Sequence, residues 1–380
     1  MKEKRSNKIF ILTITLILAL VMLLTAFMAG CKATPVTTTA TTTATTTATK
    51  TSTATATTTA TTTIKPVTLI FQSFDPEDSI WGHVFATWFK ELEKQSGGRV
   101  LVETHWNGEL IGLPDAYDAI KKGTLDIVTH LTSMPAGRFP MDEISAFSSL
   151  NVTTANYSRV QWELHKLIPE MQEPFKEVKV IWIGNSWPNP LGTSKKFGPV
   201  TKLSDNQGFK EVVFGDWQGQ LGAALGRTGV SLQPADTYSS FEKGVADGMQ
   251  ASITLFRTAK FGEVLPNITL MAGTMGAWSL IMNLDKFNKL PADVQQYITA
   301  SSEKLVDAFD AECLAEYKND IATFPKTFGT NFVTISDIDN WNKARQPVFD
   351  KFVAGLNAKG LPGTKLMSEW QRLEKQYTIK

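Results

Sequence analysis

Cysteine is scarce in this sequence, with two cysteines among 380 residues. Disulfide frameworks hold small secreted folds that cannot build a sufficient core. If Cys31 is modified, as its surroundings indicate below, Cys313 has no partner within the chain, which excludes such a framework. The stability of the fold must therefore come from an apolar core, in which we expect Cys313 to be a small buried residue.

Net charge is also nearly absent. The 38 basic and 37 acidic side chains leave a formal net charge of +1. A nucleic-acid-binding protein needs a basic face that neutralises phosphates, so we expect no nucleic-acid partner. The length instead suits one large globular unit of about two lobes, once any targeting segment is removed.

The motifs of several enzyme classes are missing. The sequence has no Gly-x-Ser-x-Gly elbow, no phosphate-binding glycine loop and no paired histidine ligands on a helix. Its histidines lie far apart and lack the cysteine or carboxylate spacing of a zinc site. They are His83, His105, His130 and His165. We therefore expect a protein that is not an enzyme and that needs neither a metal nor a cofactor.

The N-terminus has the pattern of a secretory signal. Lys2, Lys4, Arg5 and Lys8 precede an apolar run over residues 9–28. The run ends in Met28-Ala29-Gly30-Cys31, which resembles the lipobox of bacterial lipoproteins with Met28 in place of the more usual leucine. The resemblance implies that residues 1–30 are a signal peptide and that Cys31 carries a lipid. The alternative is an uncleaved transmembrane anchor, and either reading places the rest of the chain outside the cytoplasm, lipid-anchored in the first case.

A low-complexity segment follows. Residues 37–63 are nearly all threonine and alanine, without the apolar periodicity that could bury a face. We predict that residues 31–65 are a lipidated cysteine with a flexible tether, spanning on the order of 30 Å.

From residue 65 onward short apolar runs alternate with helical segments. A strand at residues 67–71 precedes a helix capped by Ser79 and stopped by two glycines. The remaining predicted strands cover residues 99–106, 125–129, 179–183, 212–214, 230–232 and 278–282, and predicted helices cover residues 114–122, 217–225 and 235–243. Strands separated by helices indicate parallel pairing through right-handed crossovers, and two α/β lobes are the natural reading.

The last part of the chain is helical. Residues 292–324 lack an internal glycine or proline and predict a helix of about 45 Å, long enough to lie across both lobes. Two further helices are predicted at residues 337–356 and 365–377. We divide the chain into lobe one (residues 66–186 with about 276–315) and lobe two (residues 187–275 with about 316–380).

Several spaced motifs between residues 66 and 355 resemble one family. In chain order they are Gly97-Gly98-Arg99-Val100, Trp106-Asn107-Gly108-Glu109-Leu110, Ala119-Ile120-Lys121-Lys122-Gly123, Asp126-Ile127, Ala136-Gly137-Arg138-Phe139-Pro140, Thr193-Ser194-Lys195-Lys196, Leu203-Ser204-Asp205, Gly208-Phe209-Lys210, Ala224-Leu225-Gly226, Tyr238, Gly244, Ala246-Asp247-Gly248 and Leu290-Pro291. The set resembles the substrate-binding proteins (DctP family) of tripartite ATP-independent periplasmic (TRAP) transporters.

The resemblance implies a fold and a task. The fold is two-lobed and periplasmic-binding-protein-like (type II), with hinge segments and a long lobe-spanning C-terminal helix. The protein would capture a small organic solute outside the cytoplasmic membrane or in the periplasm and deliver it to the small and large TRAP permease subunits. Alternatives keep the fold but serve an ATP-driven (ABC) importer or a membrane sensor kinase. A secreted hydrolase would need a nucleophile or paired carboxylates in the cleft, and the sequence makes none visible.

Ligands of α/β sheets lie beyond the carboxyl ends of the strands. That rule selects residues 129–138, 185–191 and 214–217, together with Gln250. The predicted ligand-binding residues there are Arg138, Trp187, Asn189, Phe214, Trp217 and Gln250. Arg138 is the only strong cation among them.

Two arginines that the resemblance leads one to expect are missing. Val212 stands where most members of the family hold a carboxylate with an arginine, and Pro190 aligns with a second arginine seen in some members. Few residues replace an arginine fork. The solute is therefore expected to be either an organic acid held in another way or a neutral or aromatic compound. Loss of both arginines also permits a degenerate receptor that transports nothing.

Overall fold

The structure, a computed structural model, describes residues 36–41, 59–185, 188–232 and 236–379. It divides into two compact units, Met1–Pro66 and Val67–Lys380. The predicted signal peptide, Cys31 and Trp187 lie outside the described residues. Within the described ranges no helix combines the length and the apolar character that a membrane span requires.

The described part of the first unit is a pair of strands. β1 (Val36–Thr41) pairs antiparallel with β2 (Thr59–Ile64). Threonine is β-branched and favours extended backbone, which accounts for strands in this composition, and the assignment of residues 31–65 as a tether stays a prediction.

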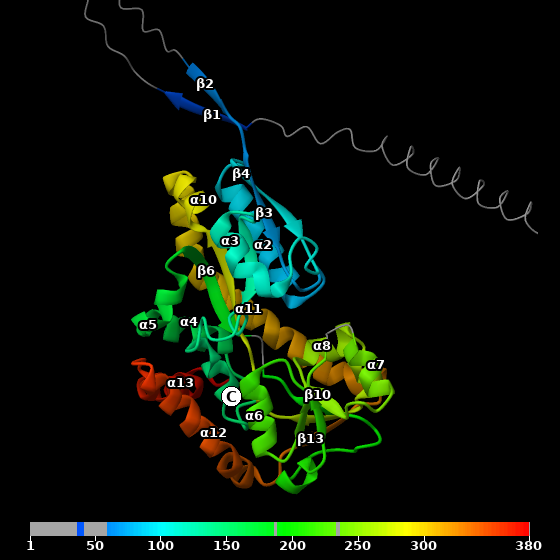
Figure 1. Cartoon of the computed structure of the whole chain (residues 1–380). Helices are drawn as coiled ribbons and strands as arrows, with labels where there is room; N and C mark the ends of the chain where they lie inside the picture. The colour runs from blue at the N-terminus through cyan, green and yellow to red at the C-terminus, as the bar shows by residue number, and fades with distance from the viewer. Residues whose placement is uncertain (1–35, 42–58, 186–187, 233–235, 380) are drawn as a thin grey trace, which may run out of the picture. The chain divides into compact units, whose positions relative to one another are not determined.

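The first sheet of the second unit has the strand order β4-β3-β5-β12-β6 (Figure 1). Its strands are β3 (Val67–Gln72), β4 (Val100–His105), β5 (Ile127–Leu131), β6 (Val178–Asn185) and β12 (Ala277–Asn283). β3 is parallel to β4 and β5, as predicted. β12 is antiparallel to both of its neighbours.

The second sheet has the strand order β13-β11-β7-β10-β8-β9. Its strands are β7 (Leu191–Thr193), β8 (Lys210–Val212), β9 (Thr228–Val230), β10 (Gly248–Gln250), β11 (Asn267–Leu270) and β13 (Asn331–Thr334). β8 is parallel to β9 and β10, whereas β7 is antiparallel to β10 and β11.

The prediction of parallel pairing was therefore wrong for β12, which covers the predicted strand at residues 278–282, and β7, a strand that the sequence did not predict, is also antiparallel to both of its neighbours. Each of these strands follows directly from a strand of the other sheet, β7 from β6 and β12 from β11. No helical crossover returns the chain to the starting edge, so each strand enters its sheet in the opposite direction.

Helices surround both sheets. The α-helices are α2 (Ile80–Gln95), α3 (Ala116–Lys122), α4 (Tyr157–Leu167), α5 (Pro169–Gln172), α6 (Asp216–Ala224), α7 (Thr237–Glu242), α8 (Ile253–Thr258), α9 (Phe261–Val264), α10 (Leu284–Lys289), α11 (Ala292–Thr327), α12 (Ile338–Ala358) and α13 (Gly363–Tyr377). Short 3₁₀ turns are η1 (Leu113–Asp115), η2 (Asp142–Phe147), η3 (Glu173–Phe175) and η4 (Leu203–Asn206).

The start of α2 and the end of α3 lie where the sequence predicts. The Ser79 side chain accepts a hydrogen bond from the Gly82 amide and caps α2. Gly123 ends α3 with a left-handed φ of 73°, a conformation that glycine adopts without steric cost.

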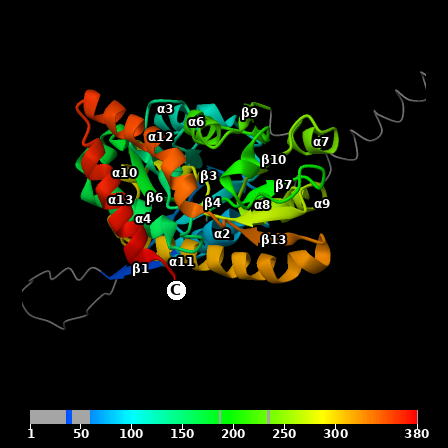
Figure 2. The same ribbon diagram turned by 90° about the horizontal axis from the view of Figure 1, so that it is seen from below.

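The long helix α11 has 36 residues and contacts α2, α4 and β6 as well as α8 (Figures 1 and 2). Leu305 and Phe309 are buried in the core of the first sheet, together with Cys313. Phe324, nearer the C-terminal end of the same helix, is buried in the core of the second sheet. The predicted two-lobed α/β fold with a lobe-spanning helix is thereby confirmed.

The last two helices form a separate apolar cluster. α12 packs on α6, and α13 packs on α12 and α4. Tyr157 of α4 donates its hydroxyl hydrogen to Glu374 of α13 at 2.8 Å. The predicted division into lobes stays a prediction, and it would have to accommodate the contact that α13 makes with α4.

Candidate functional site

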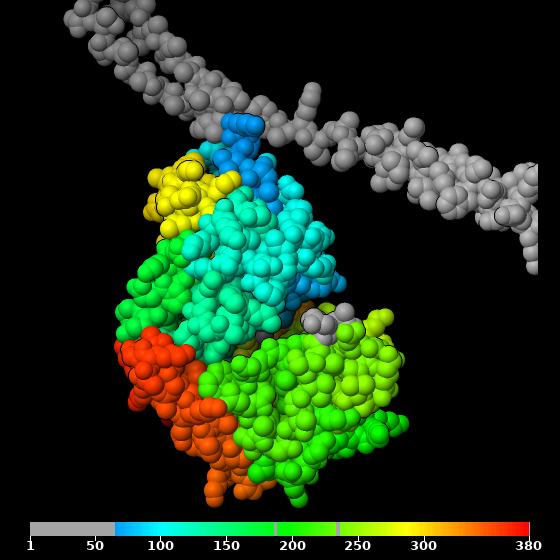
Figure 3. All heavy atoms as spheres, viewed as in Figure 1, coloured from blue at the N-terminus to red at the C-terminus, as the bar shows by residue number. Residues whose placement is uncertain are grey.

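A cavity of about 320 Å³ lies where strand ends of the two sheets face each other. Figure 3 shows the corresponding hollow between the cyan part and the green part of the surface. Its lining comprises Asp75, Trp81, Leu131, Thr132, Ser133, Asp142, Glu143, Ser145, Ala146, Asn189, Phe214, Gly215, Asp216, Trp217, Gln218, Met249, Gln250, Ala251, Ser252, Leu255, Thr274, Met275, Gly276, Ala277 and Trp278. The loops after β3, β5, β8 and β10 all contribute, as expected for carboxyl ends of strands.

Four of the six predicted residues line this cavity: Asn189, Phe214, Trp217 and Gln250. Arg138 does not. Its Nη1 lies 2.8 Å from Asp118 Oδ1, and its guanidinium lies 4.8 Å from the centre of the Tyr117 ring. Arg138 is thus held by its own neighbours, as most loop arginines are. That the other residues touch a ligand stays a prediction.

Gln250 and Asn189 hold the chain segment that crosses back between the sheets. Gln250 Oε1 accepts a hydrogen bond from the Thr274 amide at 2.8 Å. Asn189 Nδ2 donates to the Thr274 carbonyl at 2.6 Å. The Oδ1 of Asn189 is buried and has no hydrogen-bond partner among the described residues, so it can accept a bond from a donor inside the cavity.

Phe214 and Trp217 differ in how available their rings are. Phe214 is 40% exposed although it is large and apolar. Trp217 packs edge-on against Phe147 and Phe352, and its Nε1 donates to Glu143 Oε2 at 2.6 Å. Phe214 therefore offers an exposed ring, whereas Trp217 is fixed between η2 and α12.

Sequence reasoning missed three of the four carboxylates that line the cavity. Asp75, Asp142, Glu143 and Asp216 all line it, and of these only Asp216 lies in a segment that the strand-end rule selected, residues 214–217. Asp75 follows β3 by three residues, so the strand-end rule could have selected it. No pattern in the sequence marks η2, which carries Asp142 and Glu143.

Burial perturbs two of these carboxyl groups strongly. Burial raises the pKa of Asp75 to about 7. Burial raises the pKa of Asp142 to about 8; the nearby Glu143 adds to the rise and a hydrogen bond from Gln161 opposes it. Burial also raises the pKa of Glu143, against the hydrogen bond from Trp217.

The two positions where the resemblance predicted arginine contribute nothing to the lining. Val212 is fully buried in the core of the second sheet. Pro190 is buried, and its carbonyl accepts a hydrogen bond from the Ala251 amide. Val212 and Pro190, which stand where the resemblance predicts arginines, are thus both packing residues of the second sheet.

A buried ion pair supports the second-sheet side of the cavity. Arg227 Nη1 lies 3.2 Å from Glu211 Oε1, and both side chains are fully buried. The same Glu211 oxygen accepts a hydrogen bond of 2.6 Å from Gln250 Nε2. Gln250 is therefore oriented by a chain of contacts that begins at Arg227.

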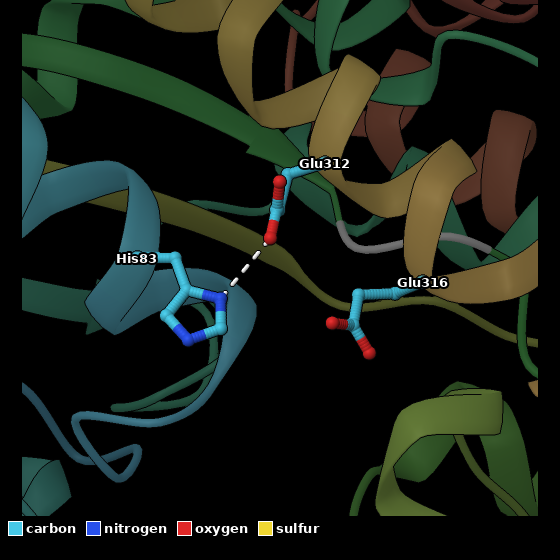
Figure 4. Close-up of side chains that lie close together, drawn as sticks. All are labelled: His83, Glu312 and Glu316. Carbon is cyan, nitrogen blue, oxygen red and sulfur yellow. Dashed lines mark hydrogen bonds and ion pairs between the residues drawn. The ribbon is translucent and has the colours of Figure 1, made fainter. Parts of the chain in front are cut away.

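Outside the cavity lining, one group among the described residues could hold a metal ion. His83 of α2 and Glu312 and Glu316 of α11 bring three ligand atoms within 4.8 Å of one another (Figure 4). His83 Nδ1 lies 3.1 Å from Glu312 Oε1, and His83 is exposed. Glu316 is already paired with the Arg257 guanidinium, so a cationic group occupies one ligand and we assign no metal there.

Two α/β sheets that face each other across a cavity, joined by two crossings and a long helix, define a two-lobed solute-binding protein. The model of DctP, bacterial extracellular solute-binding protein family 7, matches residues 71–355. The chain belongs to this family, which supplies the extracytoplasmic substrate-binding proteins of TRAP transporters, and the predicted resemblance is confirmed.

Similar proteins agree with this assignment. A solute-binding protein of Sulfitobacter sp. (strain NAS-14.1) is 27% identical over 284 residues, covering 72% of this chain and 83% of the relative. Two crystal structures of TRAP solute-binding proteins are similar in fold. The one from Desulfovibrio salexigens, an open complex, has a TM-score of 0.74 at 22% identity and covers 82% of this chain and 97% of its own. The one from Rhodoferax ferrireducens, in complex with copurified benzoate, has a TM-score of 0.71 at 22% identity, with coverage of 82% and 98%.

Proposed function

We propose that this protein captures a small organic solute in the cavity, closes over it, and releases it unchanged to a TRAP permease. The observation that carries the proposal is that both sheets contribute to one cavity of about 320 Å³, the lower end of the range for small-molecule sites. Contacts from both sides favour the closed state by their differential affinity for it.

We propose that the solute carries an apolar or aromatic body. The exposed ring of Phe214 offers a stacking face. The Rhodoferax ferrireducens protein, which has the same fold, holds benzoate, and a ring of that size suits the volume of this cavity. Trp217 would add apolar contact, and Asn189 Oδ1, which has no partner among the described residues, would supply a polar contact, with the second Nε2 hydrogen of Gln250 as a donor.

We also propose that the protein catalyses no reaction on the solute. Carboxylates line the cavity, and paired carboxylates can act in catalysis. Glu143, however, already accepts a hydrogen bond from Trp217, and the family consists of transport proteins. The solute should therefore leave the protein with its mass unchanged.

The test uses the full chain in detergent with a panel of small solutes. A true ligand at about 100 times its Kd should stabilise the native state by about 2.7 kcal/mol, visible as a rise in Tm. X-ray scattering should show a smaller radius of gyration with that ligand. Phe214→Ala should weaken binding about fivefold, since a lost aromatic contact costs on the order of 1 kcal/mol.

Leu110→Ala is the matched control, because Leu110 is an exposed apolar residue outside the cavity lining. A ligand that stabilises the protein without compaction would contradict closure. Recovery of a chemically altered solute by mass spectrometry would contradict the non-enzymatic role.

We also propose that Cys31 anchors the protein to the outer face of the cytoplasmic membrane through a lipid. The motif Met28-Ala29-Gly30-Cys31 after an apolar run supports this. Cys31→Ser should abolish incorporation of labelled fatty acid, whereas Cys313→Ala should leave the label in place. If the Cys31→Ser variant still incorporates labelled fatty acid, the lipid is attached at another residue.

A further inference from the structure

The charge of the cavity is one-sided. Among the described residues that line it, four are acidic and none is lysine, arginine or histidine. The internal gaps at residues 186–187 and 233–235 hold serine, tryptophan, glutamine, proline and alanine, so the sequence places no basic residue there. A carboxylate entering this cavity would therefore find no basic counter-charge among these residues.

One of the carboxylates has a buried oxygen that no donor among the described residues reaches. The Oδ2 of Asp75 is buried without a hydrogen-bond partner among the described residues. Asp142 is 1% exposed, and its Oδ1 accepts a hydrogen bond from Gln161 Nε2 at 2.8 Å. A buried acceptor without a donor costs free energy. A ligand that brings N–H donors or positive charge would offset that cost.

Aromatic rings line the same cavity. Trp81 and Trp278 line the cavity as a tilted pair with ring centres 5.1 Å apart. Phe214 lines it from the second sheet. The faces of aromatic rings attract cations, tryptophan most strongly, so rings and carboxylates favour the same sign of charge.

The N-terminus of α6 could favour an anion, because helix N-termini carry partial positive charge. Its first residue, however, is Asp216, whose carboxylate complements that charge. The Phe214 amide just before the helix donates to Gln218 Oε1 at 3.0 Å. The protein itself thus supplies acceptors at this helix end.

We propose that the solute is a small organic ammonium ion, bound by Asp75 and Asp142 and by the ring faces of Trp81, Trp278 and Phe214. This identifies the ligand class of the receptor proposed above and rests on that function. It goes beyond a missing acid clamp, since the described lining residues include four carboxyl groups and no basic side chain.

Binding should depend on pH in a specified direction. The buried carboxyls of Asp75 and Asp142 have pKa values raised to about 7 and about 8. An ammonium ion pairs with the ionised form of these groups, so its binding is coupled to the release of their protons. The other charges that face them are Glu143, which raises the pKa of Asp142, and Asp216 and Lys359, which act on Glu143 with opposite signs. Affinity for a cation should rise between pH 6 and pH 8.5 with release of protons. A carboxylate ligand would instead accept hydrogen bonds from the protonated carboxyls and bind more tightly as pH falls.

The experiment compares solutes of matched shape and different charge on the full chain in detergent. Choline is compared with its neutral isostere 3,3-dimethylbutanol, and benzylammonium with benzyl alcohol and benzoate. Tm shifts and calorimetric titration are recorded at pH 6 and pH 8.5, with the proton count obtained from buffers of different ionisation enthalpy. At least one cation should bind at least about tenfold more tightly than its neutral partner, and about tenfold more tightly at pH 8.5 than at pH 6.

Variants assign the effect to the carboxylates. Asp75→Asn and Asp142→Asn should each reduce cation affinity at least about tenfold, the change expected when a buried ionic partner is neutralised. Asp339→Asn, an exposed position on α12 outside the lining, should leave it unchanged.

The outcomes separate the two proposals. Tighter binding of benzoate, or of a neutral compound, with compaction of the protein would overturn the ammonium assignment and leave the receptor function standing. If neither cation binds at 20 mM, or if cation affinity falls as pH rises, the ammonium assignment is wrong. If no compound in this or the wider solute panel binds, the receptor function fails as well.

Discussion

Replacing Arg227 with methionine should lower the free energy of unfolding by roughly 3–5 kcal/mol, the usual cost of breaking a buried ion pair from one side. The Glu211 carboxylate would stay fully buried without its cation. Arg227 also donates from Nε to Asn206 Oδ1 at 2.7 Å, and its guanidinium lies against the Phe209 and Trp341 rings. Methionine keeps much of the packing volume and adapts to its surroundings, so the loss measures mainly the charge and its hydrogen bonds.

The double variant Arg227→Met, Glu211→Gln is the control. Glutamine keeps an acceptor oxygen for Gln250 Nε2, which now bonds Glu211 Oε1 at 2.6 Å, and it removes the stranded charge. Urea unfolding of the three proteins should show the double variant recovering most of the loss. A single variant within 1 kcal/mol of the wild type would show that the buried carboxylate finds another partner.

Asp142→Asn should stabilise the ligand-free protein, and increasingly so as pH rises. In the unfolded chain an aspartate ionises near pH 4, whereas burial raises the pKa of Asp142 in the folded protein to about 8. Between these values the folded state binds the extra proton, so the wild type loses stability as pH rises from about 4 to about 8. Asparagine has no proton to lose, and the gain should reach the order of 3–5 kcal/mol above pH 8.

Urea unfolding at pH 5, 7 and 8.5 checks this. Asp339→Asn, at an exposed site on α12, should follow the wild type at each pH. Parallel pH profiles for the wild type and Asp142→Asn would mean that Asp142 is not held neutral in the fold. A residue that destabilises the empty protein and improves binding is the usual sign of a functional site.

Long, locally marked elements of the fold were predictable from the sequence. The helix α2 has a serine cap and a double-glycine stop, and α11 has a continuous helical composition, so local signals decided both. β7 and β10 have three residues each, too few to show a period of two. The direction of β7 also depends on the chain arriving from the other sheet, which no local pattern encodes.

The candidate site was predictable where a strand end and a conspicuous side chain coincide. Phe214 and Gln250 met both conditions and line the cavity. Arg138 met them too, but tertiary contact with Asp118 and Tyr117 engages its charge. Asp142 lies in an irregular turn, and its altered ionisation arises from burial by distant segments, which the sequence does not display.

The hydrogen bonds of Thr274 have a mechanical consequence. The segment of residues 271–276 carries the chain from β11 back to β12, so rotation of one sheet against the other must twist it. Thr274 is tied there to Gln250 and Asn189, and all three line the cavity. Under the proposed function, the part of the cavity that these residues line would also be the pivot of closure. Atoms near a pivot move little, so the proposed solute would contact Thr274 before closure, whereas its contacts with Asp75 and Phe214, which follow strands of different sheets, would be completed only by closure.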